Sequence, residues 1–205
     1  NSAIDQAITC ARQTLKLSGN TTPQKCKNII SQLSLRANEL PPNTTLRNRL
    51  ELALCEIDWQ FGSQQLLKNN RAKVGEIAAG TNPDNLALAT ALLVALNSES
   101  EPEAAIQYVA TIGDNLETLQ QAEELLEFAP ANTTANQNLQ TVKLALISKV
   151  LGLPELQQAD KAKLKANWRL KQATALIALK QNQQASQTLA ELEKKYPRNA
   201  EIQMQ

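Results

Sequence analysis

The sequence predicts an all-α protein, and three observations support this prediction. The 205 residues are rich in Leu, Ala, Gln, Glu and Lys, which favour helices, while aromatic residues make up only 3% of the chain. Apolar residues recur at steps of three and four almost throughout, and the strict alternation of a half-buried strand is nearly absent. Most of the Gly and Pro residues lie between these periodic stretches, where they begin or end helices.

Four helices are expected before residue 80. Residues 3–17 and 23–37 each carry apolar positions in a 4-3-4 rhythm. A cap at Asn43–Thr44 opens a third helix, which ends near Gly62 and is apolar on two faces, as expected for a helix packed between neighbours. A weaker pattern over residues 63–79 indicates a fourth helix.

The rest of the chain is expected to hold about six more helices. Pro83 stands at the first position of one of them, and Ser100 with Glu103 forms a capping box for the next. Asp114 and Glu117 form a further cap pair. The remaining expected helices cover residues 133–152, 161–180 and 185–196. Short connections make consecutive helices antiparallel neighbours, so about ten helices stacked in pairs predict an α-solenoid.

One spacing near the end of the chain resembles a known repeat. Small and large apolar positions follow one another as Ala173, Ala185, Leu189, Leu192, Tyr196 and Pro197. Residues 162–197 therefore resemble a tetratricopeptide repeat, in which two helices pack through small residues and a Pro closes a unit of about 34 residues. Ala173 stands where Gly is commoner, and Leu176 where an aromatic residue is frequent. A looser resemblance covers residues 83–130.

The resemblance implies an arrangement and a function. It implies tetratricopeptide-like repeats over residues 81–205, with divergent repeats or a helical cap over residues 1–80. It also implies an interaction scaffold that binds a partner protein or peptide in a helical-repeat groove. The segment from Leu192 to Asn199 is similar to modules of bacterial envelope proteins, including those of exopolysaccharide export. The alternative function is therefore a periplasmic module of a polysaccharide-export or secretion assembly.

The cysteines bear on the compartment. Cys10 and Cys26 lie at similar heights on two expected antiparallel helices, so they form either a disulfide or two buried thiols. A disulfide would indicate an oxidising compartment. Cys55 is expected in the core. The chain begins at Asn1 without Met, from which we expect a processed chain or a fragment. These observations favour a periplasmic or exported location and leave a cytoplasmic one open.

Several classes of function are not expected from this sequence. The chain has no histidine, which excludes Ser-His-Asp and Cys-His catalysis. Its Gly residues are scattered, so no phosphate-binding loop is present. With 21 basic and 20 acidic residues and a net charge of +1, it offers no electrostatic case for nucleic acid. No apolar run reaches the ~20 residues needed to span a bilayer. We therefore expect no enzymatic activity, no metal and no cofactor.

A few side chains are candidates for contact with a partner. They are Tyr108, Trp168, Arg169 and Lys171. Rare aromatic residues and Arg are favoured anchors in binding grooves. The competing interpretation is favoured for Trp168 and Trp59, which we expect to fill the core. The basic stretch from Lys161 to Lys171 is likewise interpreted as a solvated helix face rather than a binding patch.

Overall fold

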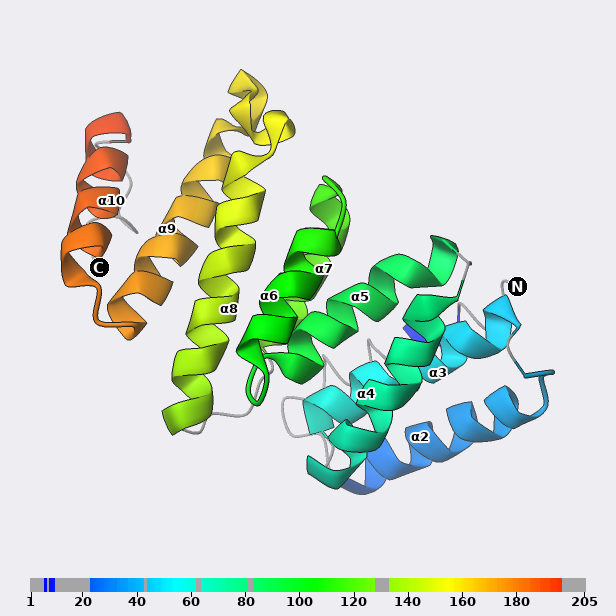
Figure 1. Ribbon diagram of the computed structural model, residues 1–205. Helices are drawn as coiled ribbons and strands as arrows, with labels where there is room; N and C mark the ends of the chain where they lie inside the picture. Colours follow the sequence, from blue (N-terminus) through cyan, green and yellow to red (C-terminus); the bar gives the residue numbers. More distant parts are fainter. Residues whose placement is uncertain are drawn as a thin grey trace. The chain divides into compact units, whose positions relative to one another are not determined.

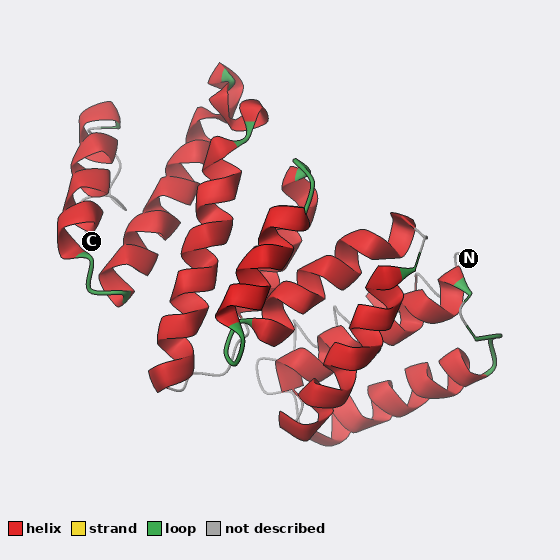
Figure 2. Cartoon of the chain, in the orientation of Figure 1, coloured by secondary structure: helices red, strands yellow, loops and turns green. Residues whose placement is uncertain are grey.

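The computed structural model describes residues 6, 8, 9, 23–42, 44–61, 64–80, 83–127 and 133–196 (Figure 1). Within these residues the chain is all-helical, with nine α-helices and no strand (Figure 2). About ten helices were expected, and the one expected over residues 3–17 lies mostly outside the described residues. None of the helices in the described part is long and apolar enough to cross a membrane.

The chain divides into two compact units, Asn1–Leu96 and Asn97–Gln205. The division expected from the sequence lies between residues 80 and 81, which is one helix earlier. The difference concerns the helix that begins at Pro83. Two side-chain hydrogen bonds attach this helix to the first unit: Asn85 Nδ2 donates to the Thr45 carbonyl at 3.1 Å, and Arg71 donates to the Leu96 carbonyl at 3.0 Å.

The first unit contains four described helices. They are α2 (Pro23–Asn38), α3 (Thr45–Phe61), α4 (Gln64–Ala79) and α5 (Pro83–Asn97). Helix α3 packs against both α2 and α4. On one face of α3, Leu50 and Ile57 join Leu33 of α2 in a buried cluster. On another face, Leu52 and Trp59 are also buried. The expectation that this helix is apolar on two faces because it packs between neighbours is confirmed.

The second unit contains five helices and two single 3₁₀ turns. These are α6 (Pro102–Thr111), α7 (Leu116–Glu127), α8 (Thr133–Gly152), η1 (Pro154–Gln157), η2 (Ala159–Lys161), α9 (Ala162–Ala178) and α10 (Asn182–Lys195). Helix α8 packs against α6, α7 and α9, and α9 packs against α10. Helices α8, α9 and α10 lie side by side in chain order (Figure 1). The 3₁₀ turns between α8 and α9 were not expected from the sequence, and the first of them buries Leu156 completely.

The helix starts only partly follow the expected caps. Thr44 caps α3 as expected, because its Oγ1 accepts a hydrogen bond from the Arg47 backbone amide at 3.3 Å. The capping box at Ser100 and Glu103 is wrong: Pro102 is the first helical residue, so Ser100 falls outside the cap position, which Glu101 occupies without a side-chain bond. The cap pair at Asp114 is also wrong, since Asn115 Oδ1 accepts the Thr118 amide at 3.1 Å.

The end of α6 is stabilised from a neighbouring helix. The Nζ of Lys149 on α8 donates a hydrogen bond to the Ala110 carbonyl at 2.9 Å and another to the Ile112 carbonyl. Both acceptors lie at the C-terminal end of α6, where carbonyl oxygens lack helical partners and the helix dipole favours a cation. This contact fixes α6 against α8.

A tight turn joins α9 and α10 into an antiparallel pair. The Gln181 amide donates to the Leu176 carbonyl and the Lys180 amide to the Ile177 carbonyl, both at 2.9 Å. These two bonds form a Schellman motif. At the other end of the pair, Tyr196 Oη donates to the Ala162 carbonyl at 3.0 Å. The start of α9 and the end of α10 are thereby held together.

Lys180 in this turn has a φ of 61°, in the left-handed region that favours Gly. We expect Lys180→Gly to raise the free energy of unfolding by about 0.5–1 kcal/mol, because the strain of a left-handed side-chain-bearing residue exceeds the entropic cost of Gly. Urea denaturation of both proteins measures the difference. Lys180→Ala is the control, and it should change stability by no more than ~0.5 kcal/mol because the Cβ remains. A destabilising Gly would contradict the prediction.

Candidate functional site

Two adjoining hollows lie on the surface of the second unit, between α9 and α10 and beside α8. The first has a volume of about 220 Å³ and is lined by Lys165, Ala166, Arg169, Thr188, Glu191, Leu192, Lys195 and Tyr196. The second has a volume of about 280 Å³ and is lined by Leu144, Ser148, Arg169, Gln172, Leu176, Gln184, Gln187, Thr188 and Glu191. Because three residues line both, we treat the two hollows as one feature, the α9–α10 groove.

Helical periodicity explains why these side chains meet. Apart from Ala166, the α9 residues of the groove are 165, 169, 172 and 176, at steps of four, three and four, which place them on one face of the helix. The α10 residues 184, 187, 188, 191 and 195 share a face for the same reason. The buried residues Leu170 and Leu192 contribute to the apolar cluster of this helix pair. The groove therefore lies over a packed contact between the two helices.

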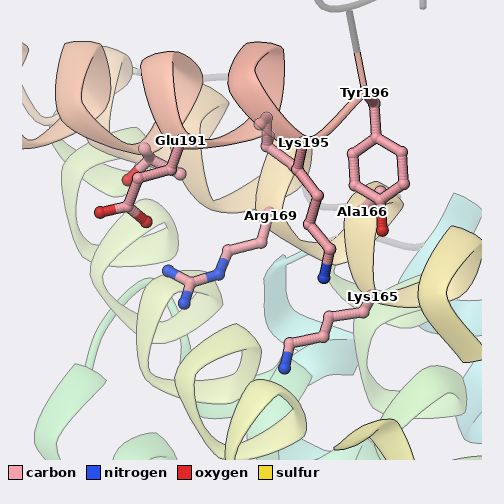
Figure 3. Close-up of a pocket in the computed structure, with 8 residues that line it drawn as sticks. Lys165, Ala166, Arg169, Glu191, Lys195 and Tyr196 are labelled. Atoms are coloured by element: carbon pink, nitrogen blue, oxygen red, sulfur yellow. The ribbon is translucent and has the colours of Figure 1, made fainter. Parts of the chain in front are cut away.

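The first hollow carries an excess of positive charge. Lys165, Arg169 and Lys195 supply three cations, and Glu191 supplies one carboxylate. In Figure 3, the charged ends of the three cationic side chains extend to the same side of the helix pair. Within the described residues, none of the three cations forms an ion pair with a carboxylate. The described part of the chain thus places no carboxylate within ion-pair distance of these three cations.

The polar contacts of these cations are to neutral groups. Lys165 Nζ donates to the side-chain oxygen of Gln157 in η1. Arg169 donates to Gln172 Oε1 at 3.1 Å. Lys195 Nζ lies 5.7 Å from the centre of the Tyr196 ring, within the range of a cation–π contact. Such contacts hold the side chains in place and leave their positive charge available to an anion.

The second hollow is lined mainly by amides and hydroxyls. Gln184 and Gln187 each offer both a donor and an acceptor, and Gln172 offers the donors of its amide while its Oε1 accepts from Arg169. Ser148 donates its hydroxyl within α8, to the Leu144 carbonyl at 2.8 Å. Thr188 uses its hydroxyl within the helix, donating to the Gln184 carbonyl at 2.9 Å. Groups of this kind suit the peptide backbone, which also carries one donor and one acceptor per residue.

The opposite face of α9 is occupied within the protein. Lys171 Nζ lies 2.5 Å from a Glu123 carboxylate oxygen and 3.3 Å from one of Glu127, both on α7. It also lies 5.3 Å from the centre of the Trp168 ring. Burial raises the pKa of Glu123 more than Lys171 lowers it. Burial alone would lower the pKa of Lys171. The carboxylates of Glu123 and Glu127 raise it by more, so the pKa of Lys171 lies above its ordinary value.

The four candidate residues from the sequence are thus not brought together. Arg169 lines the groove. Trp168 is only 3% exposed, and Lys171 contacts α7 rather than the groove. Tyr108 is half-buried on α6 and lines neither hollow. Lys195 and the glutamines of α10 were not among the residues expected at the site, although their spacing on one helix face was a signal that could have identified them.

In the described residues of the first unit, two buried ionisable side chains have shifted pKa values. Asp58 accepts a hydrogen bond from Asn70 at 3.2 Å, and burial raises the pKa of that carboxyl. Burial also raises the pKa of the Cys55 thiol to about 12. In the described part of the chain, no three His, Cys, Asp or Glu side chains gather into a metal site. Cys10 and the side chain of Cys26 lie outside the described residues, so the two alternatives, a disulfide or two buried thiols, both stay predictions.

Comparison with known proteins returns no relative: no protein-family model, no curated protein and no solved structure matches this chain. The class of protein that the fold defines is therefore an all-helical one with two compact units. The resemblance of residues 162–197 to a tetratricopeptide repeat stays an expectation.

Proposed function

We propose that this protein is an interaction module that binds an extended peptide segment of a partner protein along the α9–α10 groove. The observation that carries the proposal is the pair of adjoining hollows, which meet at Arg169, Thr188 and Glu191. A binding surface that continues from one hollow into the next suits a chain of residues. The resemblance to a tetratricopeptide repeat supports the same role, because it covers the same two helices and helical repeats present grooves to partners.

The size of each hollow favours a peptide over a small molecule. Volumes of about 220 and 280 Å³ lie just below the ~300–1,000 Å³ of sites that enclose drug-sized ligands. Each hollow can instead receive one side chain of a bound segment. The glutamines of the second hollow would then bond the backbone amides and carbonyls between those side chains. Affinity arises from many modest contacts along the groove.

The test is binding of short peptides to the full chain. A library of peptides with acetylated and amidated ends is screened on a surface, and the best binder is titrated into wild-type protein by calorimetry. Gln187→Tyr, which fills the second hollow, should weaken binding by about tenfold or more, equal to ~1.4 kcal/mol.

Gln183→Tyr is the matched control. Gln183 lies on the exposed surface of α10 but lines neither hollow. The same substitution there should change the affinity less than about twofold. The proposal fails if no peptide binds, or if the two tyrosine variants weaken binding equally.

A further inference from the structure

We infer that the first hollow of the α9–α10 groove binds a side-chain carboxylate, so that the preferred ligand is a segment containing Asp or Glu. This inference rests on the proposed peptide-binding role and specifies the chemistry of its ligand. It starts from the charges of the hollow: Lys165, Arg169 and Lys195 against Glu191. These four groups give a local charge of +2, whereas the whole chain of 205 residues carries only +1.

The three cations are placed to act on one ligand group. They come from two helices, α9 and α10, that pack against each other and are tied by the Tyr196–Ala162 hydrogen bond. Arg169 and Lys195 also contact neutral partners, Gln172 and the Tyr196 ring. The cations are therefore positioned before a ligand arrives, and a bound carboxylate would give them the ion pair that the described residues do not supply.

Two features favour a carboxylate-bearing peptide over a nucleic acid. Lys165 and Lys195 line only the first hollow. In the second hollow Arg169 is offset by Glu191 and most of the other lining residues are uncharged, so a continuous phosphate backbone would leave the positive region. The Glu191 carboxylate, which lines both hollows, would repel a polyanion along its path. One or two carboxylates in a mostly neutral segment match the distribution of charge better.

Two neighbouring lysines of α10 provide a test variant and a matched control. Lys195 lines the hollow, whereas the exposed Lys194 does not. Lys195→Glu and Lys194→Glu change the net charge of the protein equally and in the same turn of α10. A long-range electrostatic effect would act similarly on both variants, while a local carboxylate site responds only to Lys195→Glu.

The measurement is the affinity of an acidic peptide with blocked ends and of its Glu→Gln and Glu→Lys counterparts. For wild type, we expect the acidic peptide to bind about tenfold more tightly than the Glu→Gln peptide, with the difference shrinking at high salt. Lys195→Glu should abolish this preference and favour the Glu→Lys peptide, while Lys194→Glu should keep the wild-type order. Circular dichroism verifies that both variants remain helical.

The outcomes separate this inference from the proposed function. If peptides bind and Gln187→Tyr weakens them, but the acidic and neutral peptides bind equally, the carboxylate site is refuted and the peptide groove stands. Equal effects of the two Lys→Glu variants refute it as well. If a single-stranded oligonucleotide displaces the acidic peptide and binds more tightly, the site belongs to nucleic acid instead. Absence of any peptide binding refutes both proposals.

Discussion

Trp168→Ala is expected to lower the free energy of unfolding of the second unit by about 3–5 kcal/mol. The ring is only 3% exposed, so its removal leaves a large void among packed side chains of α9. The variant also removes the cation–π contact with Lys171, whose Nζ lies 5.3 Å from the ring centre. Hydrogen exchange of peptides from α9, together with urea denaturation followed by circular dichroism, measures the loss.

Ile177→Ala is the control for this prediction. Ile177 is on the same helix but is 45% exposed, so its truncation should cost no more than about 1 kcal/mol. A Trp168→Ala variant within ~1 kcal/mol of wild type would contradict the core position of the ring.

The buried position of Trp168 also decides which residues are suitable for testing binding. Loss of binding on Trp168→Ala would reflect destabilisation of α9, so Gln187 and Lys195 are better positions to test.

Lys171→Met is expected to lower the free energy of unfolding by about 2–3 kcal/mol near neutral pH. The Glu123 side chain is only 7% exposed and would lose its cationic partner, and a buried carboxylate without one is strongly unfavourable. Lys171 itself is 40% exposed, which keeps the effect below that of a fully buried pair. By contrast, Glu123→Gln should change stability by no more than ~1 kcal/mol, because the amide needs no counterion and Lys171 keeps Glu127 at 3.3 Å.

The loss of stability caused by Lys171→Met should be larger at high pH than at low pH. Burial raises the pKa of Glu123 above its ordinary value of 4.5, and Lys171 opposes that rise. Without Lys171, the pKa of Glu123 in the folded state rises further. Because the pKa of Glu123 is higher in the folded state than in the unfolded state, its protonation stabilises the fold. That stabilisation is fully present below pH 4.5 and is lost as the pH increases through the folded pKa. The deficit of the variant relative to wild type should therefore be smaller near pH 4.5 than near pH 8.

Urea denaturation at the two pH values measures this difference. Lys143 and Glu127 also act on Glu123 or its partner, so they stay unchanged in all variants. Lys163→Met is the matched control: Lys163 is an exposed lysine of α9 and should give a change within ~0.5 kcal/mol at both pH values. A deficit for Lys171→Met that is the same at both pH values would show that Glu123 does not carry the effect.

The local pattern of residues determined which segments are helical. Apolar steps of three and four predicted α3 and α9 to within a few residues, because one face of a helix must meet the core. Cap positions were less predictable. Helices α6 and α7 each begin one residue later than expected, with Pro102 first in α6 and Asn115 capping α7. Several neighbouring polar residues can each cap the unpaired backbone amides of a first turn, and only one of them does so.

The sequence by itself determined that this protein is helical and provided no signal for catalysis or metal binding. Only the tertiary structure decided what each charged face does. The basic stretch of α9 looked uniform in sequence, yet packing turned Lys171 toward α7 and left Lys165 and Arg169 beside α10. The physical reason is that helical periodicity assigns residues to faces, whereas the role of a face depends on what packs against it. Lys195 joined the groove only because α10 folds back along α9.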